Sequence, residues 1–265
     1  SKFSVASNGV LYRTDAVGCI PGILDLWFAK RVEYKDKMKK YGNSGDKEKY
    51  AFYYKRQLVQ KILLNSLYGV LGLPAFRFYD VDNATAVTTT GQTVIKSTAD
   101  MANIKYNKEL GDPDLDSNIY IDTDSVFFSA VPLMDKRTPN WKDEDQDTIA
   151  GYVNDIAEEM QDYLNDFYDI MSTKIFNVDK ENHRLEIKKE YVAKAGLWIA
   201  KKRYAQWIIS DNGVPCDKLD VKGLDVKRSS FPKAFQECMG KVLIDILRGV
   251  SEEELTKYVL DFKKN

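Results

Sequence analysis

Hydrophobic and polar positions alternate along the chain with changing period, which predicts helices and antiparallel strands in mixed order. The expected order is an extended start, a helical hairpin from Leu24 to Gly72, a helix from about Asn83 to Leu110, a strand hairpin around Asp122, an acidic helix within 143–169, two or three strands, and a final helix from Glu252 to Lys264. No strand–helix–strand unit repeats. This order is typical of an α+β fold with an antiparallel sheet.

Two segments in the second half of the chain have clear periodicity. The acidic helix places apolar residues at helical spacing, and these are expected to face inward: Ile149, Val153, Ile156, Met160 and Leu164. Further on, the β-prone runs 185–191 and 198–204 predict a hairpin that turns at Lys194-Ala-Gly196.

Residues 120–125 read Tyr-Ile-Asp-Thr-Asp-Ser between two strand-like runs, so two carboxylates lie at a hairpin tip. In an extended chain Asp122 and Asp124 point to one face while Thr123 points to the other. Two hard oxygen donors suit a divalent cation such as magnesium, which favours metal-assisted phosphoryl transfer. Asp-x-Asp is also common in solvated turns, and that alternative stays open.

Three polar residues lie along one face of the predicted helix that contains Lys61-Ile-Leu-Leu-Asn-Ser-Leu-Tyr-Gly69. At about 100° per residue, Lys61, Asn65 and Tyr68 form one stripe. A cation, an amide and a phenol on one face can bind a phosphate-bearing ligand. The alternative is the solvated side of an ordinary amphipathic helix.

The preceding predicted helix, Leu24 to Lys40, adds two cations, because Arg31 and Lys35 are one turn apart. A glycine-containing turn at 41–46 folds the two helices into a hairpin and brings these cations towards Lys61. Three cations together can hold a triphosphate. Alternatively, this is a solvated charge run with Glu33 and Asp36 as partners within the helix.

The segment Lys201-Lys-Arg-Tyr204 carries three positive charges and a phenol, which suits a nucleic-acid backbone and its minor-groove edge. Its alternative is an edge strand protected by lysines.

Together and in this order, these segments resemble family B DNA polymerases, most closely those of the T-even bacteriophage type. Asp122-Thr-Asp-Ser125 is similar to the family's C motif, Lys61–Gly69 to its B motif and Lys201–Tyr204 to its Lys-Lys-Arg-Tyr motif. The resemblance covers nearly the whole chain except the acidic region from Pro132 to about Val178.

The resemblance implies a DNA-directed DNA polymerase that uses two magnesium ions, primer-template DNA and deoxynucleoside triphosphates. The implied catalytic residues are Asp122, Asp124 and Glu190, of which the two aspartates bind metal. The implied nucleotide-binding residues are Arg31, Lys35, Lys61, Asn65 and Tyr68. The implied DNA-binding residues are Lys201, Lys202, Arg203, Tyr204, Lys227, Arg228 and Lys233. In family terms, 1–23 and 73–222 are palm, 24–72 fingers and 223–265 the start of the thumb.

Two departures from the family pattern affect these expectations. Ile121 stands where the phage type has glycine, and the family's A motif, which supplies another metal-binding aspartate, is absent. The metal site is therefore half built, and we expect no primer extension by this chain alone. An amino-terminal polymerase half carrying motif A and the exonuclease is the expected partner, whether the chain is a split-gene product or a truncated fragment.

Composition and charge limit the classes of protein and the kinds of site that fit this sequence. The 265 residues are 44% hydrophobic, which is enough for a folded core, and the net charge of −1 hides basic clusters at 31–40, 188–203 and 218–233. No apolar run reaches the length of a membrane span and the start is not signal-like, so we expect the chain to be neither membrane-bound nor secreted. The resemblance to the phage polymerases implies a phage protein in the cytoplasm of an infected bacterial host. Three dispersed cysteines and the single His183 disfavour a zinc site. The rival functions are a non-catalytic DNA- or nucleotide-binding subunit and, less well supported, a metal-dependent phosphohydrolase.

Overall fold

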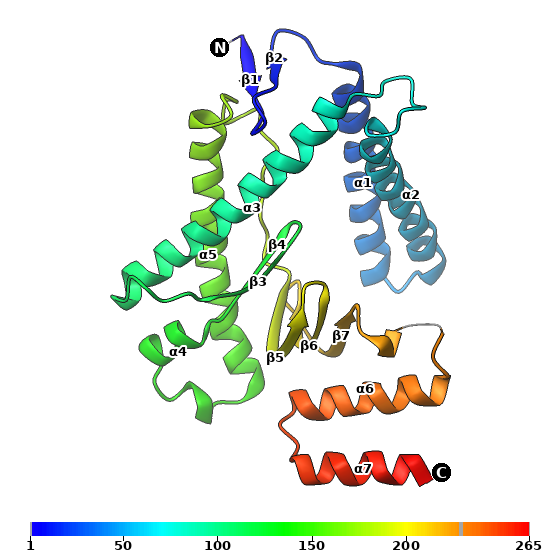
Figure 1. The fold of residues 1–265 in the computed structure, drawn as a ribbon, viewed down its shortest axis with the longest axis vertical. Coiled ribbons are helices and arrows are strands. Elements are labelled where there is room, and N and C mark those ends of the chain that lie inside the picture. The colour runs from blue at the N-terminus through cyan, green and yellow to red at the C-terminus, as the bar shows by residue number, and fades with distance from the viewer. Residues whose placement is uncertain (1, 228–229, 265) are drawn as a thin grey trace. The chain divides into compact units, whose positions relative to one another are not determined.

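The computed structural model describes residues 2–227 and 230–264, which form two compact units (Figure 1). The first unit comprises the described residues up to Val94 together with Ile170–His183. The second comprises Ile95–Asp169 and the described residues from Arg184 onward. Two long helices, α3 (Val81–Leu110) and α5 (Gln146–Lys174), contribute residues to both units. The units are described separately below.

A helical hairpin dominates the first unit. Helices α1 (Cys19–Asn43) and α2 (Lys47–Leu71) are joined by a short turn, after which the Asp46 side chain accepts a hydrogen bond from the Lys49 amide at 3.0 Å and so caps α2. The predicted hairpin is confirmed, although α1 begins at Cys19 rather than Leu24. Pro21 does not prevent this earlier start, because proline is tolerated in the first turn of a helix.

The two helices meet along a seam of half-buried residues spaced alternately three and four apart. In α1 the seam residues are Trp27, Arg31, Tyr34, Met38 and Tyr41, and in α2 they are Tyr53, Gln57, Gln60, Leu64, Leu67 and Leu71. Near the turn the seam is aromatic: the ring of Tyr53 lies 6.2 Å from that of Tyr34 and 5.6 Å from that of Tyr41. Leucines replace the aromatic and polar residues further along α2.

The first unit also contains a small antiparallel sheet of β1 (Phe3–Val5) and β2 (Leu11–Arg13). The Val5 amide donates to the Phe176 carbonyl at 2.9 Å, which ties the sheet to the segment after α5.

Three helices build one core of the second unit. Residues of α3, α5 and α4 (Val131–Arg137) pack around Tyr106, Met134 and Met160, all at most 2% exposed. Ile156 and Leu164 belong to this buried cluster, and Ile149 and Val153 pack against it, so the predicted inward face of the acidic helix is confirmed.

Arg137, at the end of α4, joins the helices of this core at the surface. Its guanidinium donates to Glu109 of α3 at 2.6 and 2.7 Å and to Glu159 of α5 at 3.0 and 2.8 Å. These hydrogen bonds lower the pKa of both carboxyl groups. A short 3-10 turn, η1 (Trp141–Asp143), leads from α4 into α5.

The strands of the second unit form two antiparallel sheets. One pairs β3 (Asn118–Asp122) with β4 (Ser125–Phe128), and the other has the order β5 (Tyr191–Ala200), β6 (Arg203–Asp211), β7 (Val214–Lys222). The chain continues through η2 (Asp225–Lys227) to α6 (Lys233–Leu247) and α7 (Glu252–Lys264). Ala205, Val221 and Leu247 form a core between the second sheet and α6. The α+β class is confirmed, with the antiparallel strands of the described residues divided among three small sheets rather than joined in one.

One predicted turn is wrong. The chain does not reverse at Lys194-Ala-Gly196; β5 continues through these residues, with irregular pairing, and reverses at Lys201-Lys202, where Lys202 has φ of 61°. Residues 185–190 form no strand. Gly196 has a packing role instead of a turning role, because a Cβ there would lie 2.2 Å from the Trp198 ring.

Candidate functional site

The two aspartates of the β3–β4 hairpin lie at and beside its tip. Asp122 ends β3 and pairs with Ser125, so only Thr123 and Asp124 form the turn. Thr123 has φ of 53°, and the Asp124 amide donates to the Asp122 carbonyl at 2.6 Å. The expectation about the two carboxylates assumed strand alternation through Thr123, and that premise is wrong because the chain is not extended there.

Asp122 is held by neighbouring groups. Its Oδ1 accepts hydrogen bonds from Lys202 Nζ at 3.0 Å and from Thr123 Oγ1 at 3.0 Å, and 22% of its side chain is exposed. The hydrogen bond from Lys202 lowers the pKa of Asp122, and the same contact raises the pKa of Lys202. Asp122 is therefore ionised at neutral pH.

Asp124 lies in the turn itself and is in a different environment from Asp122. Its side chain is exposed and has no hydrogen-bond or ion-pair partner in the part of the chain that the structure describes. The turn thus presents one anchored carboxylate and one that is open to solvent.

An aromatic cluster fixes the β3–β4 hairpin against the β5–β6 turn. The Tyr204 ring lies 5.5 Å from Tyr120 and 5.8 Å from Phe127, and the Phe127 ring lies 6.2 Å from Trp198. The Lys202 amide also donates to the Tyr120 hydroxyl at 2.6 Å. These contacts bring Lys202 and Asp122 together although 80 positions separate them.

The predicted DNA-binding residues of this turn divide into two kinds. Lys201, Lys202 and Arg203 are exposed, whereas Tyr204 is only 6% exposed and packs in the aromatic cluster. Gly223, after β7, closes the back of the turn: its φ is 63°, and a Cβ there would lie 2.0 Å from the Lys202 carbonyl oxygen. The three cations are therefore displayed by a turn that is supported from both sides.

The donors for a metal ion are incomplete within the described residues. Asp122 and Asp124 have the hard oxygens that magnesium prefers, but no group of three or more acidic, histidine or cysteine residues that could hold a metal exists in 2–227 and 230–264. Glu190 precedes β5, whereas Lys202 follows it, so the ten residues of that strand separate Glu190 from the turn that contacts Asp122. The structure does not bring the predicted Glu190 into a cluster with the two aspartates.

The polar stripe of α2 is displayed to solvent in the first unit. Lys61, Asn65 and Tyr68 are all exposed, Tyr68 to 37%, while Leu64 and Leu67 of the same turns face the seam. The stripe lies away from the seam, although Ile62 and Leu63 of the same turns are exposed as well. A cation, an amide and a phenol are thus available to a ligand along two turns of helix.

The two predicted cations of α1 are not equivalent. Lys35 is exposed, but Arg31 lies in the seam with a buried Nε that has no hydrogen-bond partner among the described residues. A buried guanidinium N–H without an acceptor is costly, so this donor of Arg31 is left unsatisfied by the described residues.

Of the remaining predicted DNA-binding residues, the structure describes the side chain of Lys233. Lys233 is the first residue of that helix, has a side chain 90% exposed and lies 3.8 Å from Glu237. Arg228 and the side chain of Lys227 lie outside the described residues.

Sequence reasoning missed the contacts that organise the turn. Tyr120, Phe127 and Trp198 were not assigned a role, although aromatic residues beside two charged motifs are a signal for packing between them. The ion pair between Lys202 and Asp122 was also missed, because nothing local links residues so far apart.

The residues assembled here can bind phosphate groups and a hard cation: an acidic turn beside three cations in one unit, and a cationic helix face in the other. A model of DNA polymerase family B matches residues 2–139 and 147–265. The chain therefore belongs to DNA polymerase family B.

Individual relatives agree with this assignment. The chain is 31% identical to the DNA-directed DNA polymerase of Enterobacteria phage T4 over 78% of its own length and 24% of the relative. It is 32% identical to the DNA-directed DNA polymerase of Escherichia phage RB69 over 71% of its length and 22% of the relative. A DNA polymerase of Thermococcus gorgonarius is 28% identical over 97% of the chain and 28% of the relative. The chain thus spans about a quarter of the length of these relatives.

The structure also bears on whether a helix of this chain could span a membrane. None of the helices in the described ranges is both long and apolar enough to cross a membrane.

Proposed function

We propose that this chain is part of a DNA-templated DNA polymerase that adds deoxynucleotides to a primer 3′ end by two-metal phosphoryl transfer. The observation that carries the proposal is the contact between Lys202 and Asp122, which joins two of the family's motifs, 80 positions apart, in one site. Membership of DNA polymerase family B and the names of the phage relatives support it.

Asp122 and Asp124 are the proposed magnesium ligands. The lowered pKa of Asp122 keeps its carboxylate charged, and the exposed Asp124 is open to an ion. Magnesium, when bound, supplies charge neutralisation at the reacting phosphate and at the leaving pyrophosphate. Lys202 balances the charge of Asp122 and fixes its orientation. The described residues support no role in the metal site for Glu190.

The proposed contacts to the incoming nucleotide come from the helical hairpin. Lys61, Arg31 and Lys35 bind the triphosphate, with the open donor of Arg31 filled by a phosphate oxygen. Asn65 lies beside Lys61 on the same stripe, and Tyr68 lies against the nascent base pair.

The proposed contacts to primer-template DNA come from exposed cations. Lys201, Lys202 and Arg203 follow the minor groove, where every Watson–Crick pair offers similar acceptors. Lys227, Arg228 and Lys233 contact the backbone. Tyr204 serves this surface by packing behind it rather than by touching DNA.

We further propose that the enzyme needs an amino-terminal portion that carries motif A, because two carboxylates alone do not surround two ions. The proposed location of the enzyme is the cytoplasm of an infected bacterium. A non-catalytic DNA- or nucleotide-binding subunit is the second candidate, and the lack of a three-carboxylate cluster in the described residues favours it for the isolated chain.

Primer extension separates these candidates. The chain is assayed with magnesium and all four deoxynucleotides, alone and mixed with an amino-terminal polymerase half that carries motif A. We expect extension only in the mixture, and none when Asp124→Ala replaces the wild-type chain. Extension by the chain alone would contradict the proposed need for motif A. Binding of primer-template without extension in any mixture would favour the non-catalytic subunit.

A further inference from the structure

A cavity of about 350 Å³ opens on the helical hairpin, and none of the residues assigned above lines it. Its lining residues are Tyr34 of α1 and Lys55, Arg56, Val59 and Gln60 of α2. The volume lies at the lower end of the range for sites that bind small ligands. It can therefore admit one small group, such as a nucleotide of a single strand.

This cavity lies on the opposite side of α2 from the Lys61 stripe. Nine residues turn an α-helix by about 900°, which is half a turn beyond two full turns. Arg56 and Asn65 are nine residues apart, as are Val59 and Tyr68. A ligand in the cavity therefore does not occupy the stripe proposed to bind the incoming nucleotide.

Cations and aromatic rings are combined at the cavity. The Arg56 guanidinium lies 4.4 Å from the centre of the Phe52 ring and 5.8 Å from that of Tyr34, and 49% of Phe52 is exposed. In the described part of the chain, neither Lys55 nor Arg56 forms an ion pair with a carboxylate. Both charges are therefore available to an anionic ligand.

The surrounding segment shares this character. Between Tyr34 and Arg56 there are eight basic and three acidic residues and six aromatic ones, a net charge of +5 in a chain whose net charge is −1. Glu33, the acidic residue just before this segment, pairs with Lys37 at 2.5 Å. The segment therefore attracts a polyanion, and its aromatic side chains favour one that carries planar bases.

Gln60 supplies a hydrogen-bonding group among the lining residues of the cavity. Its Oε1 is buried and has no hydrogen-bond partner among residues 2–227 and 230–264. A buried acceptor without a donor carries a desolvation cost. A donor from a ligand, such as the amino group of a base, would remove that cost.

We propose that this face of the α1–α2 hairpin binds single-stranded DNA, with phosphates on Lys55 and Arg56 and a base against Phe52 and Tyr34. Stacking on aromatic side chains combined with backbone cations is the usual way in which proteins hold single strands without reading sequence. That the bound strand is the unpaired template rests on the proposed polymerase function, whereas the binding itself does not.

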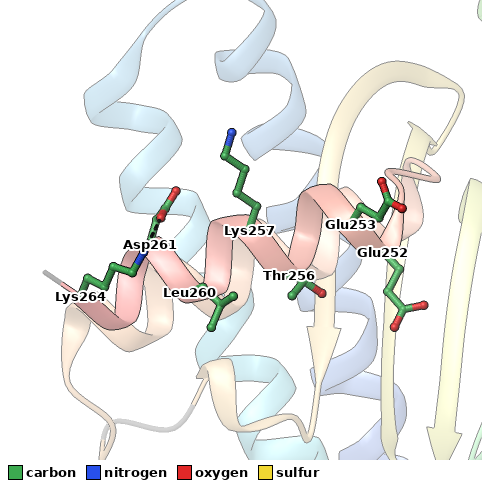
Figure 2. Close-up of a pocket in the computed structure, with 7 residues that line it drawn as sticks. All are labelled: Glu252, Glu253, Thr256, Lys257, Leu260, Asp261 and Lys264. Atoms are coloured by element: carbon green, nitrogen blue, oxygen red, sulfur yellow. Dashed lines mark ion pairs between the residues drawn. The ribbon is translucent and has the colours of Figure 1, made fainter.

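A second cavity, outside the α1–α2 hairpin, is lined by both acidic and basic residues. About 620 Å³ in volume, it lies along α7 and is lined by that helix alone (Figure 2). Figure 2 shows carboxylates and lysines interspersed along it, with Asp261 and Lys264 paired at 3.7 Å. Mixed charge gives no preference for a polyanion, which favours the α1–α2 cavity as the nucleic-acid site.

Fluorescence anisotropy of a 5′-labelled twelve-nucleotide oligo-dT tests the proposal with the 265-residue chain, without metal or nucleotide. We expect Phe52→Ala and Arg56→Ala each to raise Kd about fivefold or more. Arg56→Ala should also reduce the slope of log K against log salt by about 0.7, because one phosphate contact is lost. Circular dichroism establishes that the variants fold, and Phe52→Leu, which keeps the apolar volume without the ring, replaces Phe52→Ala if that variant unfolds.

Two matched controls lie in the same unit. Phe28→Ala removes another exposed phenylalanine of the hairpin, and Arg77→Ala removes an exposed arginine that lies 5.9 Å from the Phe78 ring. Both should leave the Kd unchanged.

Three outcomes would overturn the proposal: an unchanged Kd for both the Phe52 and the Arg56 variants, equal competition by blunt duplex DNA, or equal competition by polyglutamate. The last would identify an acidic protein segment as the ligand. Because the assay needs no second chain and no catalysis, its failure is distinct from failure of primer extension.

Discussion

Asp122 and Lys61 both lie in motifs of DNA polymerase family B, but the protein holds them in different ways. One carboxylate oxygen of Asp122 accepts two hydrogen bonds. The aromatic rings of Tyr120, Phe127 and Tyr204 pack the hairpin that carries Asp122 against the β5–β6 turn. Lys61 projects from a helix into solvent, and its position follows from its place on α2.

This difference agrees with the different roles proposed for the two residues, metal binding for Asp122 and triphosphate binding for Lys61. In the proposed metal site Asp122 supplies an orientation fixed in advance, on which charge neutralisation depends, whereas Asp124 is open to the ion. A side chain that binds a mobile triphosphate can remain free until the ligand arrives, as long as its helix presents it on the correct face. The following predictions test this contrast, from the largest expected effect to the smallest.

Asp124→Ala should reduce primer extension by the complete enzyme at least about 1000-fold, because the open carboxylate that faces the ion is lost. DNA affinity, measured by anisotropy with labelled primer-template, should change little. Asp114→Ala, which removes another exposed aspartate, is the control. Near-normal turnover of the Asp124 variant would refute its role as a metal ligand.

Tyr204→Ala should lower the free energy of unfolding by about 3–5 kcal/mol, as removal of a buried aromatic side chain usually does. The lost contacts are those with Tyr120 and Phe127. Urea denaturation of the 265-residue chain measures the effect. Tyr79→Ala, at a tyrosine that is 43% exposed, should cost far less. Similar losses for the two variants would show that the aromatic cluster does not stabilise the site.

Lys61→Ala should raise the apparent KM for deoxynucleotides about 10- to 100-fold in the complete enzyme, with a smaller change in kcat, because a charged contact to the triphosphate is removed. Its effect on the unfolding free energy should be slight, since the side chain is exposed. Steady-state extension over a range of nucleotide concentrations provides the measurement. Lys47→Ala, at an exposed lysine near the start of α2, is the matched control. An unchanged KM would remove Lys61 from the nucleotide site.

Lys202→Met should raise the pKa of Asp122 towards its ordinary value, because the hydrogen bond from Lys202 is the main cause of the lowering. A carboxyl group whose pKa is lower in the folded state stabilises the fold above its unfolded pKa, and this contribution is lost as pH falls through the folded pKa. The wild type should therefore lose a small stabilising contribution below about pH 4 that the variant does not have.

NMR titration of the Asp122 side-chain carbon measures this pKa directly. Lys201→Met is the control, since Lys201 contributes less to the lowering. Identical titration of Asp122 in the wild type and in Lys202→Met would show that the ion pair is absent in solution.

Much of the local structure could be predicted because it depends on residues close together in sequence. The stripe of Lys61, Asn65 and Tyr68 follows from the helical period, and the inward face of α5 follows in the same way. The final helix, Glu252–Lys264, has the predicted bounds. The hairpin around Asp122 was also found, because turn residues interrupt two β-prone runs.

Turn positions and side-chain environments were less predictable. Glycine at position 196 indicated a turn, but the ring of Trp198 requires that glycine within a strand, and the reversal falls at two lysines. Arg31 and Lys35 looked equivalent in sequence, yet only Lys35 is exposed, because the heptad-like seam takes up Arg31.

The sequence by itself determined the long helices and the final one, but not α4 or α6. It also determined the class of fold, the charged motifs and their resemblance to a polymerase family, since each depends on local periodicity or on residue identity. Only the tertiary structure decided that Lys202 pairs with Asp122, that Tyr204 packs behind the β5–β6 turn and that Glu190 lies at the other end of β5. Contacts across 80 positions depend on how the aromatic rings between the two sheets pack, and no local pattern encodes that packing.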